Sequence, residues 1–371
     1  YESCACLVGS EMCIRDSYVY NSVTGGFWTY SAGGAYSPTR DITFKGNYTR
    51  ALRAPSITEL YSPHGSNYDS GADPCSAQFI SSGPNPAIRA ANCAKAGIPS
   101  GFQSNINNYT VRGTISGNPH LQNESADSFE GGFTATPRWV RGFQLTAMYT
   151  NIRIRHEIES LSVGDLMASC YDSPAYPNVI ISGQNMCQQF TRDSNHQITN
   201  FNDGYYNIGQ QEMQGLSAMM AYSLPLRRLG LPEDAGEVST TVSYMHYIKN
   251  SRTYLANTYT EFGNTQTPQD HFTTNINYDR GPLSFQWQMI YYGGSKANLN
   301  VADNVYEDQN FKQYFTFNTT IGYQFATHYH VNFMMNNVFD AKPQYPYVGS
   351  LQRYYDAVIG RSFNIAIQAD F

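Results

Sequence analysis

Four cysteines stand as two pairs in the middle of the chain. Cys75 and Cys93 enclose one stretch of about 17 to 18 residues, and Cys170 and Cys187 enclose another. A disulfide across a loop of this length contributes roughly 3 kcal/mol by the chain-entropy estimate. The alternative is a metal site, but neither stretch has C-x-x-C spacing or a nearby histidine cluster. We therefore expect two disulfides, one within each stretch, of the kind that is permitted on a cell surface.

A set of arginine, glutamate and tyrosine side chains near expected strand ends has binding chemistry. A tyrosine combines a stacking face with a hydroxyl, which suits sugars or aromatic chelators. The alternative is that these tyrosines pack within loops or form an aromatic girdle. Pro55 favours a structural role for its neighbours, because a proline lacks a ladder donor and ends a strand. The candidate ligand contacts are Arg53, Glu59, Tyr61, Tyr171, Tyr176, Tyr205 and Tyr206.

No pattern in the chain predicts catalysis or a bound metal. The sequence contains no G-x-S-x-G elbow, no H-E-x-x-H and no phosphate loop. His246, His271, His328 and His330 share no spacing typical of metal ligation. A His-x-His at 328–330 could bind a metal, but a pair at the rim of a turn is the simpler interpretation. We expect no enzyme activity, no metal and no cofactor.

The composition indicates the class of fold that positions these cysteines, tyrosines and charged residues. Charged residues make up only 14% of the chain, against roughly 25% in soluble domains. Aromatic residues also make up 14%, yet the mean hydropathy is −0.45 and no run approaches the ~18 apolar residues of a membrane helix. These values suit a sheet with one apolar face and one wet, mostly uncharged face. A secreted β-sandwich is the alternative, and the net charge of −6 gives no basic footprint for nucleic acid.

From residue 27 onward, apolar and polar residues alternate in eleven segments of about ten or more residues. Globular strands average about five to six residues, whereas about ten are needed for a tilted strand to cross a bilayer. The alternation is strong at 283–293, where Leu283, Phe285 and Trp287 alternate with serine and glutamine. The expected strands are 27–37, 42–52, 125–137, 142–154, 206–224, 237–249, 270–279, 283–293, 313–325, 329–340 and 362–371.

The connections between these segments alternate between short and long. About 70 residues follow the second strand and about 50 irregular residues follow the fourth. Outer-membrane barrels have this sidedness, with short periplasmic turns and long extracellular loops. Backbone groups in hydrocarbon must all be paired, so such a sheet must close. We predict an all-β, antiparallel transmembrane β-barrel in the bacterial outer membrane, with apolar residues facing lipid and Ser, Thr, Asn and Gln facing the lumen.

The two ends of the chain carry further expectations. Bacterial single-chain barrels have even strand numbers with both ends in the periplasm, so eleven strands predict a partial barrel. The last ten residues, SFNIAIQADF, read as its closing strand, whose terminal aromatic looks like the signal read by the barrel-assembly machinery. Removing Phe371 is expected to lower outer-membrane levels. The residues of this signal are Phe363, Ile365, Ile367, Ala369 and Phe371.

The first 17 residues, YESCACLVGSEMCIRDS, differ from the rest. They include three of the seven cysteines and have neither the basic region nor the apolar core of a signal peptide. CLVGSEMCIRDS resembles a translated adaptor sequence of the kind found in metagenomic assemblies. We expect residues 1–17 to be non-native, with residues 18–371 forming the barrel segment.

Four stretches, in order along residues 27–371, resemble signatures of TonB-dependent outer-membrane receptors. Their order and strand positions are more specific than any one stretch. One departure is Asn123–Glu124, where the family usually has Pro-Glu. The four stretches are ALRAPSITELYSP (51–63), NPHLQNESADSFEGGF (118–133), YNIGQQEMQGLSAMMAY (206–222) and NNVFDAKP (336–343).

The resemblance implies the C-terminal half, about 11 of the 22 strands, of a barrel plugged by an N-terminal domain. It implies active import of a scarce siderophore, vitamin, saccharide or peptide, driven by the inner-membrane TonB complex through regions upstream of this chain. A passive porin-type channel and a surface adhesin barrel remain as alternatives. The expected partners are the TonB complex, the barrel-assembly machinery, the ligand and outer-membrane lipid, with no nucleic acid.

Overall fold

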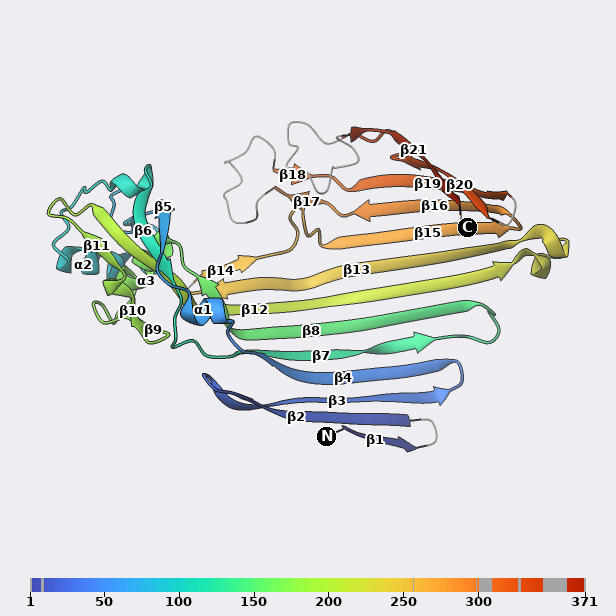
Figure 1. The fold of residues 1–371 in the computed structure, drawn as a ribbon, viewed down its shortest axis with the longest axis horizontal. Coiled ribbons are helices and arrows are strands. Elements are labelled where there is room, and N and C mark those ends of the chain that lie inside the picture. The colour runs from blue at the N-terminus through green and yellow to red at the C-terminus, as the bar shows by residue number, and fades with distance from the viewer. Residues whose placement is uncertain are drawn as a thin grey trace.

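One antiparallel meander dominates the computed structural model (Figure 1). The model describes residues 2–7, 10–255, 257–297, 299, 309–325, 328–342 and 359–369. Each long strand pairs with the long strand before it. The meander consists of β1 (Glu2–Leu7), β2 (Ser10–Asn21), β3 (Gly25–Thr39), β4 (Ile42–Arg53), β7 (Glu124–Ala135), β8 (Phe143–Ser160), β12 (Ile198–Pro225), β13 (Glu237–Tyr254), β15 (Asp270–Arg280), β16 (Leu283–Tyr292), β19 (Tyr314–Phe325), β20 (Tyr329–Asn336) and β21 (Ser362–Ala369).

The eleven strands predicted from residue 27 onward are all present, as β3 to β21 of this meander. β20 is clearly shorter than expected, because it ends at Asn336 rather than at residue 340. The meander also continues upstream, where Ser10–Asn21 pairs along Gly25–Tyr36. The boundary expected at residue 17 therefore falls inside β2. Asp370 and Phe371, the end of the expected assembly signal, lie outside the described residues.

The remaining elements lie in the connections. Their strands are β5 (Gly65–Asp69), β6 (Val111–Ser116), β9 (Ile180–Ile181), β10 (Gln184–Asn185), β11 (Phe190–Arg192), β14 (Asn257–Thr260), β17 (Ser295–Lys296) and β18 (Asn310–Phe311). Their helices are α1 (Ile57–Tyr61), α2 (Pro86–Lys95), α3 (Val163–Tyr171), η1 (Asn105–Asn107), η2 (Met186–Gln188), η3 (Leu226–Leu229) and η4 (Glu233–Ala235). No helix of the described ranges is long and apolar enough to cross a membrane.

The connection between β8 and β12, predicted to be irregular, contains regular structure, including α3. α3 begins there because the Ser162 side chain accepts a hydrogen bond from the backbone N–H of Asp165. Its apolar residues Val163, Leu166 and Met167 follow helical spacing and are fully buried. A helix of nine residues spans too few turns for its periodicity to stand out in the sequence.

The strand register separates two faces of the sheet. On β12, Leu216 and Met220 lie opposite Tyr149 and Leu145 of β8, so these four side chains share one face. We call this the apolar face. It continues across later strands, for example where Phe272 and Tyr291 stack with ring centroids 4.7 Å apart. On β21, Phe363, Ile365 and Ile367 belong to the same face, and each is more than half exposed.

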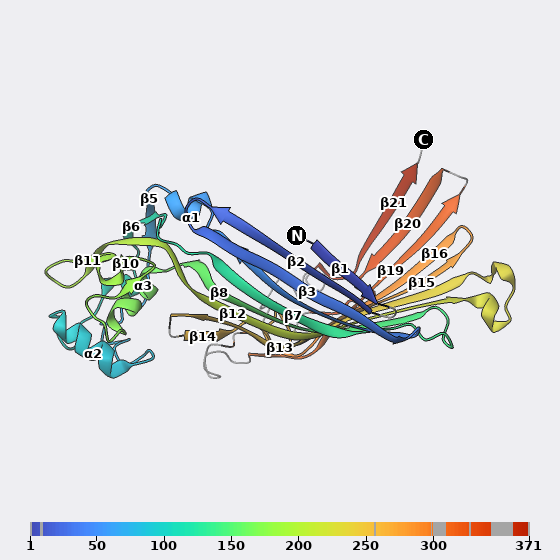
Figure 2. The same ribbon diagram turned by 90° about the horizontal axis from the view of Figure 1, so that it is seen from below.

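The sheet curves but stays open in the described residues. Figure 2 shows β2–β4 and β19–β21 rising on either side of β12 and β13. Within the described part of the chain, β21 pairs with β20 along one edge only. The short connections β3–β4, β7–β8 and β15–β16 lie at one end of the sheet, and the two longest connections lie at the other (Figure 1). The architecture is a partial antiparallel β-barrel, as the alternation predicted.

Candidate functional site

The two longest connections fold together into a lobe at one end of the sheet, made of residues 54–123 and 161–206 (Figure 1). The lobe has its own apolar core, unlike the sheet. Several of its side chains are completely buried, including Leu166, Met167, Met186 and Tyr206. The core consists of Cys75, Cys93, Ile98, Phe102, Ile106, Leu161, Val163, Leu166, Met167, Cys170, Tyr171, Val179, Met186, Phe190, Ile198, Phe201 and Tyr206. These loops are therefore packed against each other rather than lying separately.

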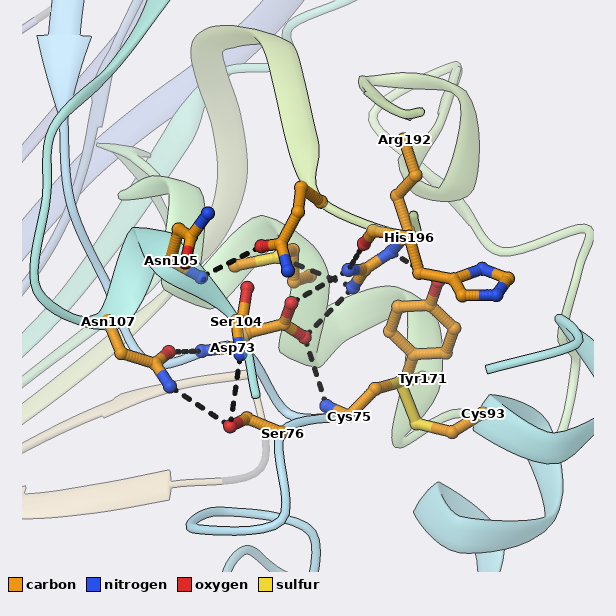
Figure 3. A network of polar contacts seen from close by, with 12 residues as sticks. Asp73, Cys75, Ser76, Cys93, Ser104, Asn105, Asn107, Tyr171, Arg192 and His196 are labelled. Atoms are coloured by element: carbon orange, nitrogen blue, oxygen red, sulfur yellow. Dashed lines mark hydrogen bonds and ion pairs between the residues drawn. A yellow bond between two sulfur atoms is a disulfide. The ribbon is translucent and has the colours of Figure 1, made fainter. Parts of the chain in front are cut away.

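A buried ion pair joins the two connections at the centre of the lobe (Figure 3). Arg192 of β11 donates from Nη1 to Asp73 Oδ2 at 2.7 Å and from Nη2 to Asp73 Oδ1 at 2.8 Å. Asp73 is fully buried and also accepts a hydrogen bond from the backbone N–H of Cys75. Burial alone would lower the pKa of Arg192, but the Asp73 carboxylate outweighs burial and raises it. The guanidinium thus stays charged within an apolar core.

Aromatic rings surround this guanidinium. The Arg192 Cζ lies 5.5 Å from the centroid of the Tyr171 ring and 5.9 Å from those of Phe102 and Phe190. Such cation–π contacts stabilise a charge that has lost its water. Burial also raises the pKa of the Tyr171 hydroxyl, which accepts a hydrogen bond from Arg192 Nε. The cluster therefore favours a neutral tyrosine beside a permanent cation.

A second set of contacts joins α2 of the first connection to the end of α3 in the second. Arg89 makes a bidentate ion pair with Asp172 and donates to the carbonyl of Phe79. Asn92 donates to the carbonyls of Tyr171 and Ser173 at 2.9 and 2.8 Å. Two independent polar clusters thus fix the two connections to each other.

Each connection also carries a disulfide. Cys75 is bonded to Cys93 of α2, and Cys170 of α3 is bonded to Cys187 of η2, with Cα–Cα distances of 5.6 and 5.0 Å. These are the two pairs expected from the sequence. Cys75, Cys93 and Cys170 are buried in the lobe core, and Cys187 is partly buried against it. The first disulfide links α2 to the chain before it, and the second links α3 to η2 after it.

Arg53, Glu59 and Glu124 form an ionic cluster where β4 ends. Arg53 donates from Nε and Nη2 to Glu124 at 2.6 Å and from Nη1 to Glu59 at 3.2 Å. Glu59 is also the third residue of α1 and closes a capping box with Ser56. Burial opposes ionisation of Glu59, but hydrogen bonds from Ser56 and Arg53 outweigh it and lower its pKa. Glu59 therefore stabilises the start of α1 and pairs with Arg53, whereas the Arg53 side chain remains about half exposed to solvent.

The tyrosines singled out from the sequence fall into two groups. Tyr206 is fully buried and Tyr171 is 3% exposed, stacked on Tyr176 at 5.7 Å between ring centroids. Tyr205 packs against a small cluster around Ile158. Tyr61 is the accessible one, with 56% of its surface exposed. The buried tyrosines shape the lobe, whereas Tyr61 presents a ring to solvent.

A cleft of about 430 Å³ lies between the lobe and the adjoining strands. The volume lies within the usual range for small-molecule sites. Its lining is rich in carboxylates, with one guanidinium from β13. The lining residues are Asn67, Asp69, Ile115, Glu159, Ser160, Leu161, Ser162, Asp165, Asp203, Ile208 and Arg252.

Each of these carboxylates has a structural partner, but Asp203 is buried with one of its two oxygens unpaired. Asp69 accepts from the backbone N–H of Val163, Asp165 accepts from the Ser162 hydroxyl, and Glu159 pairs with Arg252 at 3.3 Å. Asp203 is 4% exposed, with Oδ2 bonded to Asn67 at 2.6 Å and Oδ1 left without a hydrogen-bond partner. An unpaired buried carboxylate oxygen costs stability unless a proton or ligand satisfies it.

Residues 202–204 of β12 pair with β6 inside the lobe, beyond the part of β12 that pairs with β13. There burial, with a further contribution from Asp69, raises the pKa of Asp203 to about 7. No motif marks Asp203 in the sequence. It follows the polar, asparagine-containing end of a connection, residues 193–202, and only the fold buries it. The Ser162-x-x-Asp165 spacing, by contrast, is a signal for the start of α3 that is present in the sequence itself.

The histidines form no metal centre among the described residues, where no group of three or more His, Cys, Asp or Glu side chains could hold a metal ion. His246 Nδ1 lies 2.8 Å from Asp270 Oδ1 on the sheet. The ring of His271 packs on Tyr292 with centroids 5.0 Å apart. His328 lies in the turn before β20, and His330 lies within that strand.

A family model supports the interpretation of the fold. The model described as "TonB dependent receptor-like, beta-barrel" matches residues 14–338. No curated protein matches the chain. The match covers most of the meander and both connections of the lobe.

Solved structures of siderophore receptors share the fold. The ferric enterobactin receptor PfeA of Pseudomonas aeruginosa in complex with BCV-L6 is 15% identical, with a TM-score of 0.60 over 99% of this chain and 44% of that receptor. The siderophore receptor PirA of Acinetobacter baumannii is 14% identical, with a TM-score of 0.60 over 98% of this chain and 44% of that receptor. The chain therefore spans less than half the length of these receptors. The chain belongs to the TonB-dependent receptor family, and it carries a partial β-barrel of the bacterial outer membrane.

Proposed function

We propose that this chain is part of a receptor that imports a scarce small-molecule ligand across the outer membrane with energy from the TonB complex. The observation that carries the proposal is the family match along residues 14–338. The packed lobe adds support, because two long connections with a common core can hold a binding surface rigidly. The chain's solved structural neighbours are siderophore receptors, so a ferric siderophore is the first ligand class to test.

The lobe cleft supplies a place for initial contact with a ligand. Arg252 lies opposite Gln211 in the register, so its side chain belongs to the polar face of the sheet. The cleft lined by Arg252, Glu159 and Asp203 therefore opens on the lumen side. Tyr61 and Arg53 are the exposed candidates from the sequence, and they remain proposed contacts. Tyr171, Tyr176, Tyr205 and Tyr206 are proposed to act through the shape of the lobe.

A transport experiment separates the proposal from its alternatives. The full-length receptor is expressed in a host that lacks its own siderophore receptors, and uptake of ⁵⁵Fe-enterobactin is measured with and without a functional TonB complex. We expect uptake only in cells with TonB. Equal uptake without TonB would identify a passive channel, and cell-surface binding without uptake would support an adhesin.

Induction identifies the ligand class if enterobactin is not the ligand. Expression is compared between iron limitation and growth on single saccharides or peptides as carbon source. We expect induction under one scarce-nutrient condition. Constant expression under all these conditions, together with TonB-independent passage, would contradict the import proposal.

A further inference from the structure

Toward the lobe end of the sheet, the residues on the apolar face change from apolar to polar and charged. On β12 the face carries Leu216, Ala218, Met220, Tyr222 and Leu224, and then Gln214 and Glu212 on the lobe side. At about 3.3 Å per residue and a tilt of about 40°, the apolar run covers roughly 20–25 Å of membrane thickness. This is close to the height of the apolar band on outer-membrane barrels. The charged residues that follow therefore lie at the level of the lipid headgroups.

The register places six charged side chains from neighbouring strands on this face at that level. Arg50 of β4 lies opposite Asp127 of β7, which lies opposite Arg153 of β8. Arg153 in turn lies opposite Glu212 of β12, and Lys249 of β13 lies opposite Gln214. We call this set the headgroup band. Its members are Arg50, Asp127, Arg153, Arg155, Glu212 and Lys249.

The two carboxylates of the headgroup band are covered and hold the cations in place. Asp127 accepts from Arg155 Nη1 at 3.0 Å and from the Tyr48 hydroxyl at 2.8 Å. Glu212 accepts from Lys249 Nζ at 2.7 Å and from Arg153 Nη2 at 3.1 Å. Their side chains are only 18% and 13% exposed. Both carboxylates are thus largely covered by the side chains that pair with them.

The four cations are the exposed part of the band. The side chains of Arg50, Arg153 and Arg155 are 39%, 42% and 44% exposed, and that of Lys249 is 47% exposed. Four cations against two carboxylates leave an excess of two positive charges, on a chain whose net charge is −6. This excess of positive charge is confined to the headgroup band. On either side of the band the same face carries a carboxylate, Asp16 on β2 and Asp270 beside His246 on β15.

We propose that the headgroup band is a binding site for the phosphate groups of a phosphorylated glycolipid in the outer leaflet of the outer membrane. Guanidinium groups match phosphate oxygens with paired N–H donors, and the band presents three of them beside an ammonium. The apolar run below it is positioned for the acyl chains of the same lipid. The site lies on the opposite face from the proposed import path, so it does not depend on which ligand is transported.

A double variant tests the site with each carboxylate kept paired. Arg50→Gln with Arg153→Gln removes the excess charge, yet leaves Arg155 on Asp127 and Lys249 on Glu212. The matched control is Lys95→Gln with Arg112→Gln, which removes two exposed cations from the lobe. The probe is bis-phosphorylated lipid A added to the purified full-length receptor in non-ionic detergent. Bound copies are counted by native mass spectrometry, and folding is checked by heat-modifiable gel mobility.

We expect the double variant to bind the probe about thirtyfold more weakly, at about 1 kcal/mol for each cation near a charged lipid surface. The control should bind like the wild type. Dephosphorylated lipid A and phosphatidylglycerol should bind the wild type weakly, which identifies the phosphorylated glycolipid as the source. Arg50→Lys with Arg153→Lys should retain most of the binding. Equal binding by the double variant, or an equal loss in the control, would overturn the proposal.

Failure of the double variant to fold would not end the test. Arg50→Gln alone leaves both carboxylates with their closest partners and is expected to bind about fivefold more weakly. Added salt should weaken wild-type binding by screening. A single variant with wild-type affinity, together with salt-independent binding, would count against a phosphate site.

Discussion

The lobe and the sheet of this protein are stabilised in opposite ways. The lobe buries side chains such as Leu166 and Tyr206 completely, and it holds Arg192 and Asp73 as a charged pair inside that core. The sheet holds its strands by backbone ladders and leaves large apolar side chains exposed, such as Ile365 at 70% and Phe129 at 49%. The difference shows which solvent each region is built for. The lobe excludes water from an internal core, whereas the apolar face of the sheet is matched to lipid.

The largest effect is expected from neutralising Asp73 in the lobe. Asp73→Asn keeps an acceptor for the N–H of Cys75 but leaves the charge of Arg192 buried without a counter-ion. Breaking a buried pair in this way costs about 3–5 kcal/mol. We expect rapid proteolysis of the lobe in the full-length receptor, while the barrel keeps its folded mobility on unheated gels.

Arg138→Gln is the control for the Asp73 variant. Arg138 pairs with Asp41 at 2.8 Å, but its side chain is 68% exposed, so its loss should cost less than about 1 kcal/mol. Equal proteolysis in both variants would show that the buried pair does not hold the lobe together.

A charged residue introduced on the apolar face should destabilise the sheet and leave the stability of the lobe unchanged. Met220 lies in the middle of the apolar run on β12, and its neighbour Met219 lies on the polar face. Met220→Arg should destabilise the barrel by about 2–4 kcal/mol, because an arginine at the bilayer midplane loses its water. Met219→Arg is the matched control and should be tolerated.

Outer-membrane abundance and gel mobility of the full-length receptor report the result. We expect less folded protein for Met220→Arg than for Met219→Arg. The assignment of the two faces would be wrong if the Met219 variant were the more harmful one.

Removing one disulfide should loosen the lobe by a smaller amount. Cys170→Ser with Cys187→Ser opens a bridge with a sequence separation of 17, worth about 3 kcal/mol at most by chain entropy. Cys75–Cys93 and both ion pairs remain, so we expect local opening near α3 rather than loss of the lobe. Hydrogen exchange of α3 amides should speed up, and the amides of β15 and β16 should be unchanged. Faster exchange across the whole sheet would contradict an independent lobe.

The smallest effect concerns pH. The pKa of Asp203 is raised in the folded lobe to about 7, so the folded state holds this proton more tightly than the unfolded chain does. Its contribution to lobe stability is present at low pH and is lost as pH rises through about 7. Hydrogen exchange in β6, after correction for the intrinsic rate, should therefore be faster at pH 8 than at pH 6. Asp203→Asn should remove most of that difference, and an unchanged pH dependence would exclude Asp203 as its source.

Much of the sheet could be predicted because its pattern is local. Alternation along segments such as 283–293 follows from the two-residue period of a strand, and it needs no knowledge of the partners. The cysteine pairing was also accessible, because each pair lies within one connection. The packing of the lobe could not be predicted from local sequence patterns. Its contacts, such as Arg192 with Asp73 and Asn92 with the carbonyl of Tyr171, join residues 119 and 79 positions apart.

The candidate site shows the same division. Arg53 and Glu59 were found because they lie in a family-like stretch at a strand end, and the structure joins them with Glu124. Asp203 was missed because nothing in its sequence surroundings distinguishes it from an exposed loop aspartate. Its burial comes from β6 packing beside β12, and that pairing joins distant parts of the chain.

The sequence by itself determined the strands, their two faces and the alternation of short and long connections, since each depends on residues close together in the chain. The tertiary structure decided that the two longest connections form one lobe, that Asp203 is left with an unpaired oxygen, and that four cations gather at one level of the apolar face. These features depend on register between strands. A shift of one residue would turn every side chain of a strand to the other face, so only the paired sheet places them together.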